Sequence, residues 1–318
     1  MFGEHLAGIY EKALNPQDSW DKRLMKIKRL GFDFFEISID EQDDRIGRLY
    51  WTDKKKEELR RCCYDNGVAM MSMCLSGHRR FPFGSSDIHV REKAFDIMDR
   101  AIEFAAATGI RVIQLAGYDV YYEPSSADTI KRFREAICWA AGRAERMQVM
   151  LAMEIMDTPF MNSMVTHLGY EAIVRSPWYR AYPDMGNLCA WSENDPDAEF
   201  ARAIGSIVAV HVKDTLPVKP GFKGQFKMVP FGDGCVDFAA RFRQLEQLGY
   251  HGPFLIEMWY EGGDDESNVR KAANWLEQQF LAGIAEEDIT APNNDRDRKI
   301  GNKSLLQTDR RIAKCWKP

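Results

Sequence analysis

Short apolar segments and amphipathic helical segments alternate along most of this chain, and this alternation restricts its fold more than any other feature. Between residues 5 and 283, eight apolar runs of strand length are each followed by a stretch with helical periodicity. The expected strands cover residues 5–10, 32–39, 68–75, 111–115, 149–155, 179–185, 207–212 and 253–258. The first expected helix ends at residue 30. The other expected helices cover residues 52–66, 88–108, 126–147, 168–175, 197–204, 236–248 and 266–281.

Strands joined by helical crossovers run parallel and are buried on both faces, which explains why these runs are so apolar. Eight such units in about 280 residues predict an α/β fold of the (β/α)8 TIM-barrel type. The alternative is a doubly wound open sheet, which usually carries a glycine-rich nucleotide loop after its first strand. Residues 11–15 read Glu-Lys-Ala-Leu-Asn and contain no such loop, so the barrel is favoured.

We expect the barrel to form one catalytic domain over residues 1–284. Residues 285–318 are polar and lack apolar periodicity, which predicts a mobile or peripheral tail.

The charge and cysteine content narrow the class of protein. The 43 basic and 48 acidic side chains leave a formal charge of −5, which does not fit a general nucleic-acid binder. No apolar run approaches the roughly 18 residues that span a bilayer, and residues 1–10 do not resemble a signal peptide. Seven cysteines without a CxxC pair are typical of reduced thiols. We therefore expect a cytoplasmic protein with neither nucleic-acid nor membrane partners.

An ionisable side chain stands at the end of each of the last four expected strands. These residues are Glu154, Asp184, His211 and Glu257. Because all strands of a parallel barrel end at the same face, we expect the four side chains to converge there. Three crowded carboxylates repel one another, and a divalent cation relieves that repulsion. This set of three oxygen ligands and one nitrogen ligand suits one Mn²⁺, Zn²⁺, Co²⁺ or Mg²⁺ ion.

Several segments resemble a known family of sugar-phosphate enzymes. The segments with this resemblance are residues 76–85, 114–122, 153–157, 182–187, 211–214, 230–234 and 255–259. They are similar to the L-ribulose-5-phosphate 3-epimerases, also called L-xylulose-5-phosphate 3-epimerases, which belong to the xylose-isomerase-like TIM barrels. The resemblance extends over residues 6–283 and leaves the tail outside.

This resemblance implies a metal-dependent isomerase that interconverts L-xylulose 5-phosphate and L-ribulose 5-phosphate, in pentose phosphate metabolism that includes L-ascorbate utilisation. Epimerisation at C3 removes a proton next to the C2 carbonyl and returns one from the opposite face. The metal, bound to O2 and O3, would stabilise the cis-enediolate. By position in related ketose epimerases, Glu154 and Glu257 would be the catalytic acid and base as well as metal ligands, and Asp184 and His211 would complete the metal shell. A homodimer is one possible assembly.

Five residues are candidates for binding the phosphorylated ketopentose. His78 and Arg79 follow the third strand, where a guanidinium could hold the phosphate. Lys213 shares a strand face with His211 and could hold phosphate or neutralise the carboxylates, and Glu36 could bind a substrate hydroxyl from inside the barrel. Asn187 stands where some related ketose 3-epimerases have a histidine and could also bind a hydroxyl.

Three other functions fit parts of the pattern. An aldose–ketose isomerase could use the same barrel and shift a proton between C1 and C2. An abasic-site endonuclease would need more strand-end histidines than this chain offers, since it has only six in all, and a basic face for DNA. A non-catalytic sugar-phosphate sensor would not need two glutamates able to exchange protons.

Overall fold

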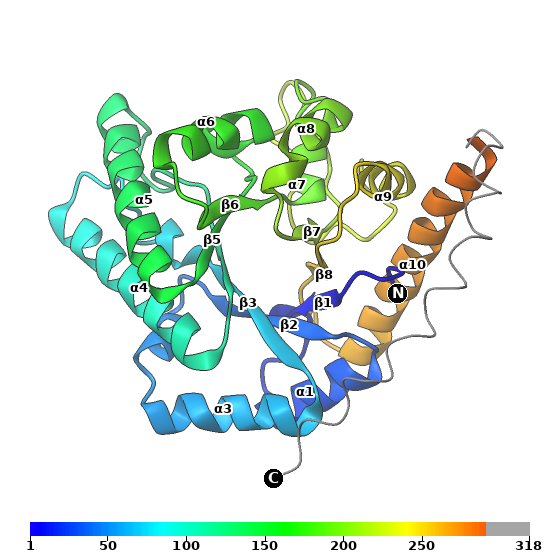
Figure 1. Cartoon of the computed structure of the whole chain (residues 1–318), viewed down its shortest axis with the longest axis horizontal. Coiled ribbons are helices and arrows are strands. Elements are labelled where there is room, and N and C mark those ends of the chain that lie inside the picture. The colour runs from blue at the N-terminus through cyan, green and yellow to red at the C-terminus, as the bar shows by residue number, and fades with distance from the viewer. Residues whose placement is uncertain (291–318) are drawn as a thin grey trace, which may run out of the picture.

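The computed structural model describes residues 1–290, with side chains described through residue 285. Eight parallel strands lie at the centre of the molecule, and helices surround them (Figure 1). The strands are β1 (Ala7–Tyr10), β2 (Phe34–Ile39), β3 (Ala69–Leu75), β4 (Val112–Leu115), β5 (Met150–Glu154), β6 (Tyr179–Tyr182), β7 (Val210–Val212) and β8 (Phe254–Ile256). This is the predicted (β/α)8 barrel.

The helices connect successive strands and form the outer layer. They are α1 (Trp20–Arg29), α2 (Asp43–Ile46), α3 (Asp53–Asn66), α4 (Ile88–Thr108), α5 (Ala127–Met147), α6 (Met164–Val174), α7 (Met185–Cys189), α8 (Pro196–Ala203), α9 (Phe238–Gln247) and α10 (Asp265–Thr290). Within the described residues, none of these helices is both long and apolar enough to cross a membrane.

The strands pair in the order β6-β5-β4-β3-β2-β1-β8-β7, so the barrel is nearly closed. The gap between β6 and β7 is bridged at two isolated points, Ala181 with Ile207 and Asp184 with His211. The backbone N–H of His211 donates to Pro183 O over 2.9 Å at the second point. The barrel seam therefore fixes Asp184 and His211 next to each other.

Side chains fill the barrel and leave no room for a Cβ on β1. Phe34 and Leu255 are buried inside, in one cluster with Tyr10 and Cys74. Gly8 faces the ring of Phe34, and a Cβ added at Gly8 would overlap that ring. A glycine at this position is thus required by packing and not by a turn.

Most predicted elements are confirmed, with differences where polar side chains interrupt a strand. Residues 179–185 were expected to form one strand, but β6 ends at Tyr182 and α7 begins at Met185. Asp184 caps this helix, because its Oδ1 accepts the Asn187 N–H over 2.7 Å. The short helix α2 was not predicted.

The expected domain boundary at residue 284 does not coincide with the end of an element. Helix α10 continues through Thr290, so it includes the first residues of the expected tail although the sequence shows no apolar periodicity there. Of the mobile or peripheral tail expected over residues 285–318, residues 291–318 lie outside the described residues.

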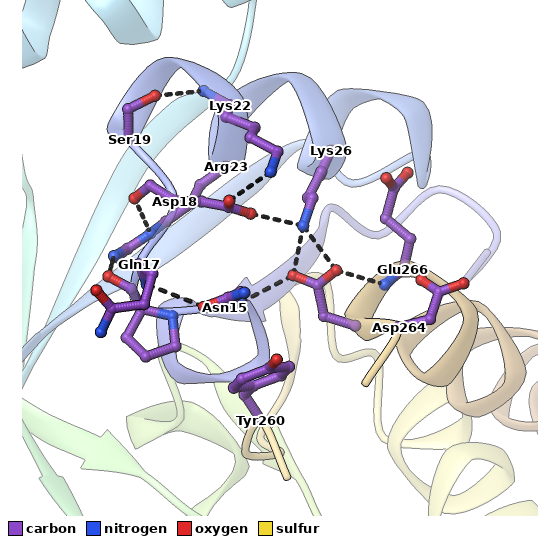
Figure 2. Close-up of polar contacts among 12 residues, drawn as sticks. Asn15, Gln17, Asp18, Ser19, Lys22, Arg23, Lys26, Tyr260, Asp264 and Glu266 are labelled. Carbon is purple, nitrogen blue, oxygen red and sulfur yellow. Dashed lines mark hydrogen bonds and ion pairs between the residues drawn. The ribbon is translucent and has the colours of Figure 1, made fainter. Parts of the chain in front are cut away.

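A polar network joins the first and last helices of the barrel (Figure 2). Lys26 on α1 places its Nζ 2.7 Å from Asp18 Oδ2 and 2.7 Å from both carboxylate oxygens of Asp265, the first residue of α10. Asp265 Oδ2 also accepts the backbone N–H of Asn15 over 2.8 Å. Lys26 and Asp265 are 7% and 4% exposed, so water screens their attraction only weakly. The network thus joins the first and last helices of the outer layer, next to the paired strands β1 and β8.

We predict that Lys26→Met lowers the free energy of unfolding by about 3 kcal/mol, because it leaves the buried Asp265 carboxylate without its cation. Urea unfolding monitored by circular dichroism measures this loss as a lower midpoint. Lys22→Met is the matched control on the same helix. Lys22 also pairs with Asp18 but is exposed, so its loss should cost less than about 1 kcal/mol. Equal losses in the two variants would contradict a structural role for the network.

Candidate functional site

The four strand-end residues predicted from the sequence converge at one face of the barrel. Glu154 is the last residue of β5, Asp184 lies two residues after β6, His211 is in β7 and Glu257 follows β8. Each offers one ligand atom, and these atoms all lie within 4.8 Å of one another. All four residues are buried.

The imidazole of His211 is held so that one nitrogen faces the cluster. Its Nε2–H donates to Glu36 Oε1 over 3.1 Å, deeper in the barrel. Its Nδ1 faces Glu154 Oε1 at 3.4 Å and Asp184 Oδ2 at 4.0 Å. A carboxylate on one imidazole nitrogen fixes the ring and leaves the other nitrogen for a metal. Glu36 therefore orients His211.

Lys213 lies on the other side of the cluster and pairs with two of the carboxylates. Its Nζ is 3.1 Å from Asp184 Oδ2 and 2.9 Å from Glu257 Oε2. Burial would lower the pKa of Lys213, but Asp184 and Glu257 outweigh it and raise that pKa above its ordinary value. Of the two roles considered for Lys213, the geometry favours neutralisation of the carboxylates.

The three carboxyl groups of the cluster differ in proton affinity. Burial raises the pKa of Asp184 to about 7, despite the opposing effect of Lys213. Burial also raises the pKa of Glu154, against a hydrogen bond with His211. Burial alone would raise the pKa of Glu257, but Lys213 and His211 lower it to about 2. Burial thus dominates at Glu154 and the cationic neighbours dominate at Glu257, so the pKa values of the two glutamates shift in opposite directions.

The cluster has the charge and the ligands that a divalent cation requires. Among the described residues, only the His211 imidazole and the Lys213 ammonium lie within ion-pair distance of Glu36 and the three carboxylates of the cluster. Asp184 Oδ2 and Glu257 Oε2 are buried and accept no hydrogen bond within the described chain, although Lys213 is within ion-pair distance of both. Buried carboxylate oxygens of this kind are normally paired or bound to metal. The residues present fit one divalent ion with carboxylate and imidazole ligands.

A pocket of about 250 Å³ opens from the cluster. Glu154, Glu257 and Lys213 line it at the cluster, and Trp259 follows Glu257 along its wall. The other residues that line it are Tyr10, Lys12, Asp40, Glu41, Gln42, Cys74, Ser76, Arg79, Tyr118, Met156, Asp157, Asn187, Phe226 and Lys227. A cavity of about 340 Å³ adjoins it and shares Lys213, Glu257 and Trp259.

Two predicted substrate-binding residues, Asn187 and Arg79, line this pocket, and each has a polar atom without a hydrogen-bond partner among the described residues. The Oδ1 of Asn187 is buried and has no hydrogen-bond partner in the described chain, while its Nδ2 donates to Ile155 O over 2.8 Å. Arg79 donates from Nη2 to the Tyr118 hydroxyl over 3.1 Å, and its Nε has no partner among the described residues. Both side chains can therefore offer further polar contacts to a ligand.

The other two predicted contacts, by His78 and Glu36, do not line the pocket. His78 is 4% exposed, its Nε2–H donates to Ala94 O over 3.1 Å, and its ring stacks on Phe83. Burial lowers the pKa of His78 to about 4, so the ring is neutral at pH 7. Glu36 is fully buried beneath His211. The sequence placed His78 after the third strand and Glu36 inside the barrel, but it does not show which way their side chains turn, so their contacts with the substrate stay predictions.

Sequence reasoning missed two residues that the structure brings to the site. Gln114 on β4 is fully buried, and its Nε2–H donates to Glu154 Oε2. A polar residue between apolar neighbours in a strand is the signal that could have found it. Lys227 lies in the long loop after β7, where no periodicity indicates a direction for its side chain.

Comparisons with known proteins agree with this geometry. The sequence profile of the xylose isomerase-like TIM barrel family matches residues 24–279. The L-ribulose-5-phosphate 3-epimerase UlaE of Escherichia coli strain SMS-3-5 is 51% identical over 281 residues, which cover 88% of this chain and 96% of that protein. The protein of the same name from Escherichia fergusonii is similar to the same extent.

A solved structure of an L-ribulose 3-epimerase shares the fold. Its TM-score is 0.71 at 18% sequence identity, and the match covers 91% of this chain and 98% of that chain. The profile match and the 51% identity over nearly the whole barrel show that the chain belongs to the xylose isomerase-like TIM barrels and, among them, to the L-ribulose-5-phosphate 3-epimerase family.

Proposed function

We propose that this protein interconverts L-ribulose 5-phosphate and L-xylulose 5-phosphate by epimerisation at C3, with Glu154 and Glu257 as the proton-transferring groups. The observation that carries this proposal is the placement of two buried glutamates at one pocket, in the same cluster as Asp184 and His211. The names of the 51% identical relatives support C3 epimerisation over an aldose–ketose shift.

The chemistry needs two groups that exchange protons with C3 from opposite faces of the sugar. One glutamate removes the C3 proton, which gives a cis-enediolate, and the other delivers a proton to the opposite face. The donated Nε2–H of Gln114 and the ammonium of Lys213 hold Glu154 and Glu257 respectively. Each carboxylate is thus fixed in place while it gains or loses a proton. The order in which the two act depends on the direction of the reaction.

Glu154, Asp184, His211 and Glu257 would hold one divalent metal ion, such as Mn²⁺, Zn²⁺, Co²⁺ or Mg²⁺. When bound, the ion would stabilise the negative charge that develops on the substrate oxygens. Asn187 Oδ1, which has no partner in the described chain, would accept a hydrogen bond from a substrate hydroxyl. Arg79 would contact the phosphate, since its guanidinium lines the same pocket.

We predict that Glu257→Gln slows exchange of the substrate C3 hydrogen with solvent deuterium by about 100-fold or more, because an amide cannot accept that proton. NMR of L-ribulose 5-phosphate in deuterated water measures this exchange, and circular dichroism checks that the variant is folded. Glu135→Gln, an exposed change on α5, is the control and should exchange at the wild-type rate. Undiminished exchange in folded Glu257→Gln would refute the assigned role.

Metal removal should abolish the activity. After dialysis against EDTA we expect no C3 exchange, and addition of Mn²⁺, Zn²⁺, Co²⁺ or Mg²⁺ should restore it for at least one of these ions. Calorimetric titration of the metal-free protein should give one site, and Asp184→Asn should weaken it because one of the ligands is lost. Full activity in metal-free protein would rule out the metal site as part of the mechanism.

The substitution Glu36→Gln tests whether the Glu36 carboxylate orients the imidazole of His211. An amide oxygen accepts the Nε2–H less strongly than a carboxylate, so the imidazole becomes a poorer ligand. We expect metal affinity to fall by about 10- to 100-fold, measured by the same titration, while the thermal midpoint shows that the barrel is intact. Unchanged metal affinity would mean that Glu36 does not act through His211.

A further inference from the structure

The loop between β7 and α9, residues 213–237, forms one wall of the pocket. Its first part folds back on itself, because Leu216 pairs with Gln225 and Lys219 pairs with Phe222 in antiparallel bridges. Phe226 and Lys227 follow directly and line the pocket. The folded segment thus delivers two side chains to the substrate region from outside the barrel.

Packing and hydrogen bonds hold this loop in place. The Val218 N–H donates to Ala190 O over 2.8 Å, and the Phe226 ring lies 6.0 Å from the ring of Trp191. Gln225 Nε2 donates to the backbone oxygen of Lys227 over 3.0 Å. Met228, which comes next, has a φ of +59°, a left-handed conformation that non-glycine residues adopt mainly where the surroundings enforce it. The backbone at Lys227 is therefore held in a defined position.

The far end of the loop is anchored by Asp214. Its Oδ2 accepts the backbone N–H groups of Gly232 and Gly234 over 2.9 and 3.0 Å. These amides are already satisfied by a carboxylate, so the glycine segment is not available to bind a phosphate. An anion site in this loop would have to use a side chain.

Lys227 differs from the other cations that line the pocket because it lacks an acidic partner. Lys12 pairs with Asp40, and Lys213 pairs with Asp184 and Glu257. Arg79 donates to Tyr118 and lies 3.6 Å from Glu41. By contrast, Lys227 forms no ion pair or side-chain hydrogen bond within the described residues, and its ammonium lies 5.8 Å from the centre of the Trp259 ring. Its side chain is exposed.

Lys227 shares the pocket wall with Glu257 and with Arg79. Its charge interacts with those of Glu257, Lys213, Arg79 and Asp157. Surrounding protein atoms and the charge of Arg79 lower the pKa of Lys227. An anion bound between these two cations would relieve their repulsion and would gain charge-assisted hydrogen bonds from both.

We infer that Lys227 binds the phosphate group of the substrate together with Arg79, and that it sets the preference for phosphorylated over free ketopentoses. The inference rests on the proposed function, in which the carbon that exchanges its proton lies at Glu154 and Glu257. The phosphate on C5 then extends away from the cluster within the same pocket, whose wall includes Lys227 and Arg79.

The adjoining cavity offers the competing position for the phosphate. Lys271 on α10 lines it and is exposed, with no ion pair within the described residues. Its remaining lining includes the apolar side chains of Met228, Phe231 and Trp275, which do not hydrogen-bond a phosphate. We therefore place the phosphate with Lys227, and Lys271 serves as a test of the alternative.

The experiment compares Lys227→Met with two matched variants, Lys223→Met and Lys271→Met. Lys223 is exposed in the same loop but lies outside the pocket. For each protein, kcat/KM is measured with L-ribulose 5-phosphate and with L-ribulose. We expect Lys227→Met to lower kcat/KM for the phosphorylated sugar by about 10- to 100-fold, mainly through KM, and to lower it much less for the free sugar. The two control variants should keep the wild-type ratio.

Binding of inorganic phosphate, measured by calorimetry, separates this inference from the proposed function. If the wild type does not epimerise the phosphorylated sugar but Lys227→Met still loses phosphate binding, the proposed function fails and the anion site stands. If the wild type is active and Lys227→Met changes both substrates equally, the inference is wrong. A loss confined to Lys271→Met would likewise overturn it and place the phosphate in the adjoining cavity.

Discussion

Repulsion among buried carboxylates is the constraint on which this site depends. Glu154, Asp184 and Glu257 are buried in one cluster, and the buried Glu36 is joined to it through His211. Carboxylates in such surroundings take up protons unless cations compensate them. Lys213 compensates in part, and the pKa of Asp184 at about 7 shows that the compensation is incomplete. A divalent cation bound at such a site would remove this repulsion, which is why we propose a metal here.

The barrel tolerates the repulsion among these carboxylates because its strands hold the charged groups in fixed positions. Asp184 and His211 face each other across the seam between β6 and β7, where backbone pairing sets their spacing. Gln114 on β4 holds Glu154 on the adjacent β5, and Glu36 on β2 holds His211 on β7, with β1 and β8 between them. Both contacts leave the other atoms of Glu154 and His211 directed at the cluster. Side chains held this firmly keep ligand geometry close to what a metal requires. The polar network around Lys26 and Asp265 adds a connection in the outer layer, because it joins α1 to α10.

The sequence was sufficient to predict the barrel and its four central residues, since both follow from periodicity. An apolar run shows where a strand ends, and in a parallel barrel every strand end lies at the same face. Side-chain direction beyond the strands does not follow from periodicity. The side chain of His78 points away from the pocket, because it hydrogen-bonds Ala94 O on α4 and stacks on Phe83. Its neighbour in the sequence, Arg79, lines the pocket. Lys227 could not be placed either, because its position depends on Gln225, Trp191 and a left-handed residue after it.

This contrast separates the part of the protein that we propose performs the chemistry from the part that we infer selects the substrate. The proposed proton-transferring groups and the residues that hold them come from strands or from residues directly after strands, so substitutions there would disturb the barrel. Lys227 comes from a loop whose hold on the barrel is local, through Ala190, Trp191 and Asp214. Such a loop can exchange one side chain at little cost to folding. An unpaired lysine at this position costs little in the free protein and would be satisfied when an anion enters. The inferred phosphate contact would thus favour a phosphorylated sugar over a neutral one without altering the carboxylates proposed to act on C3.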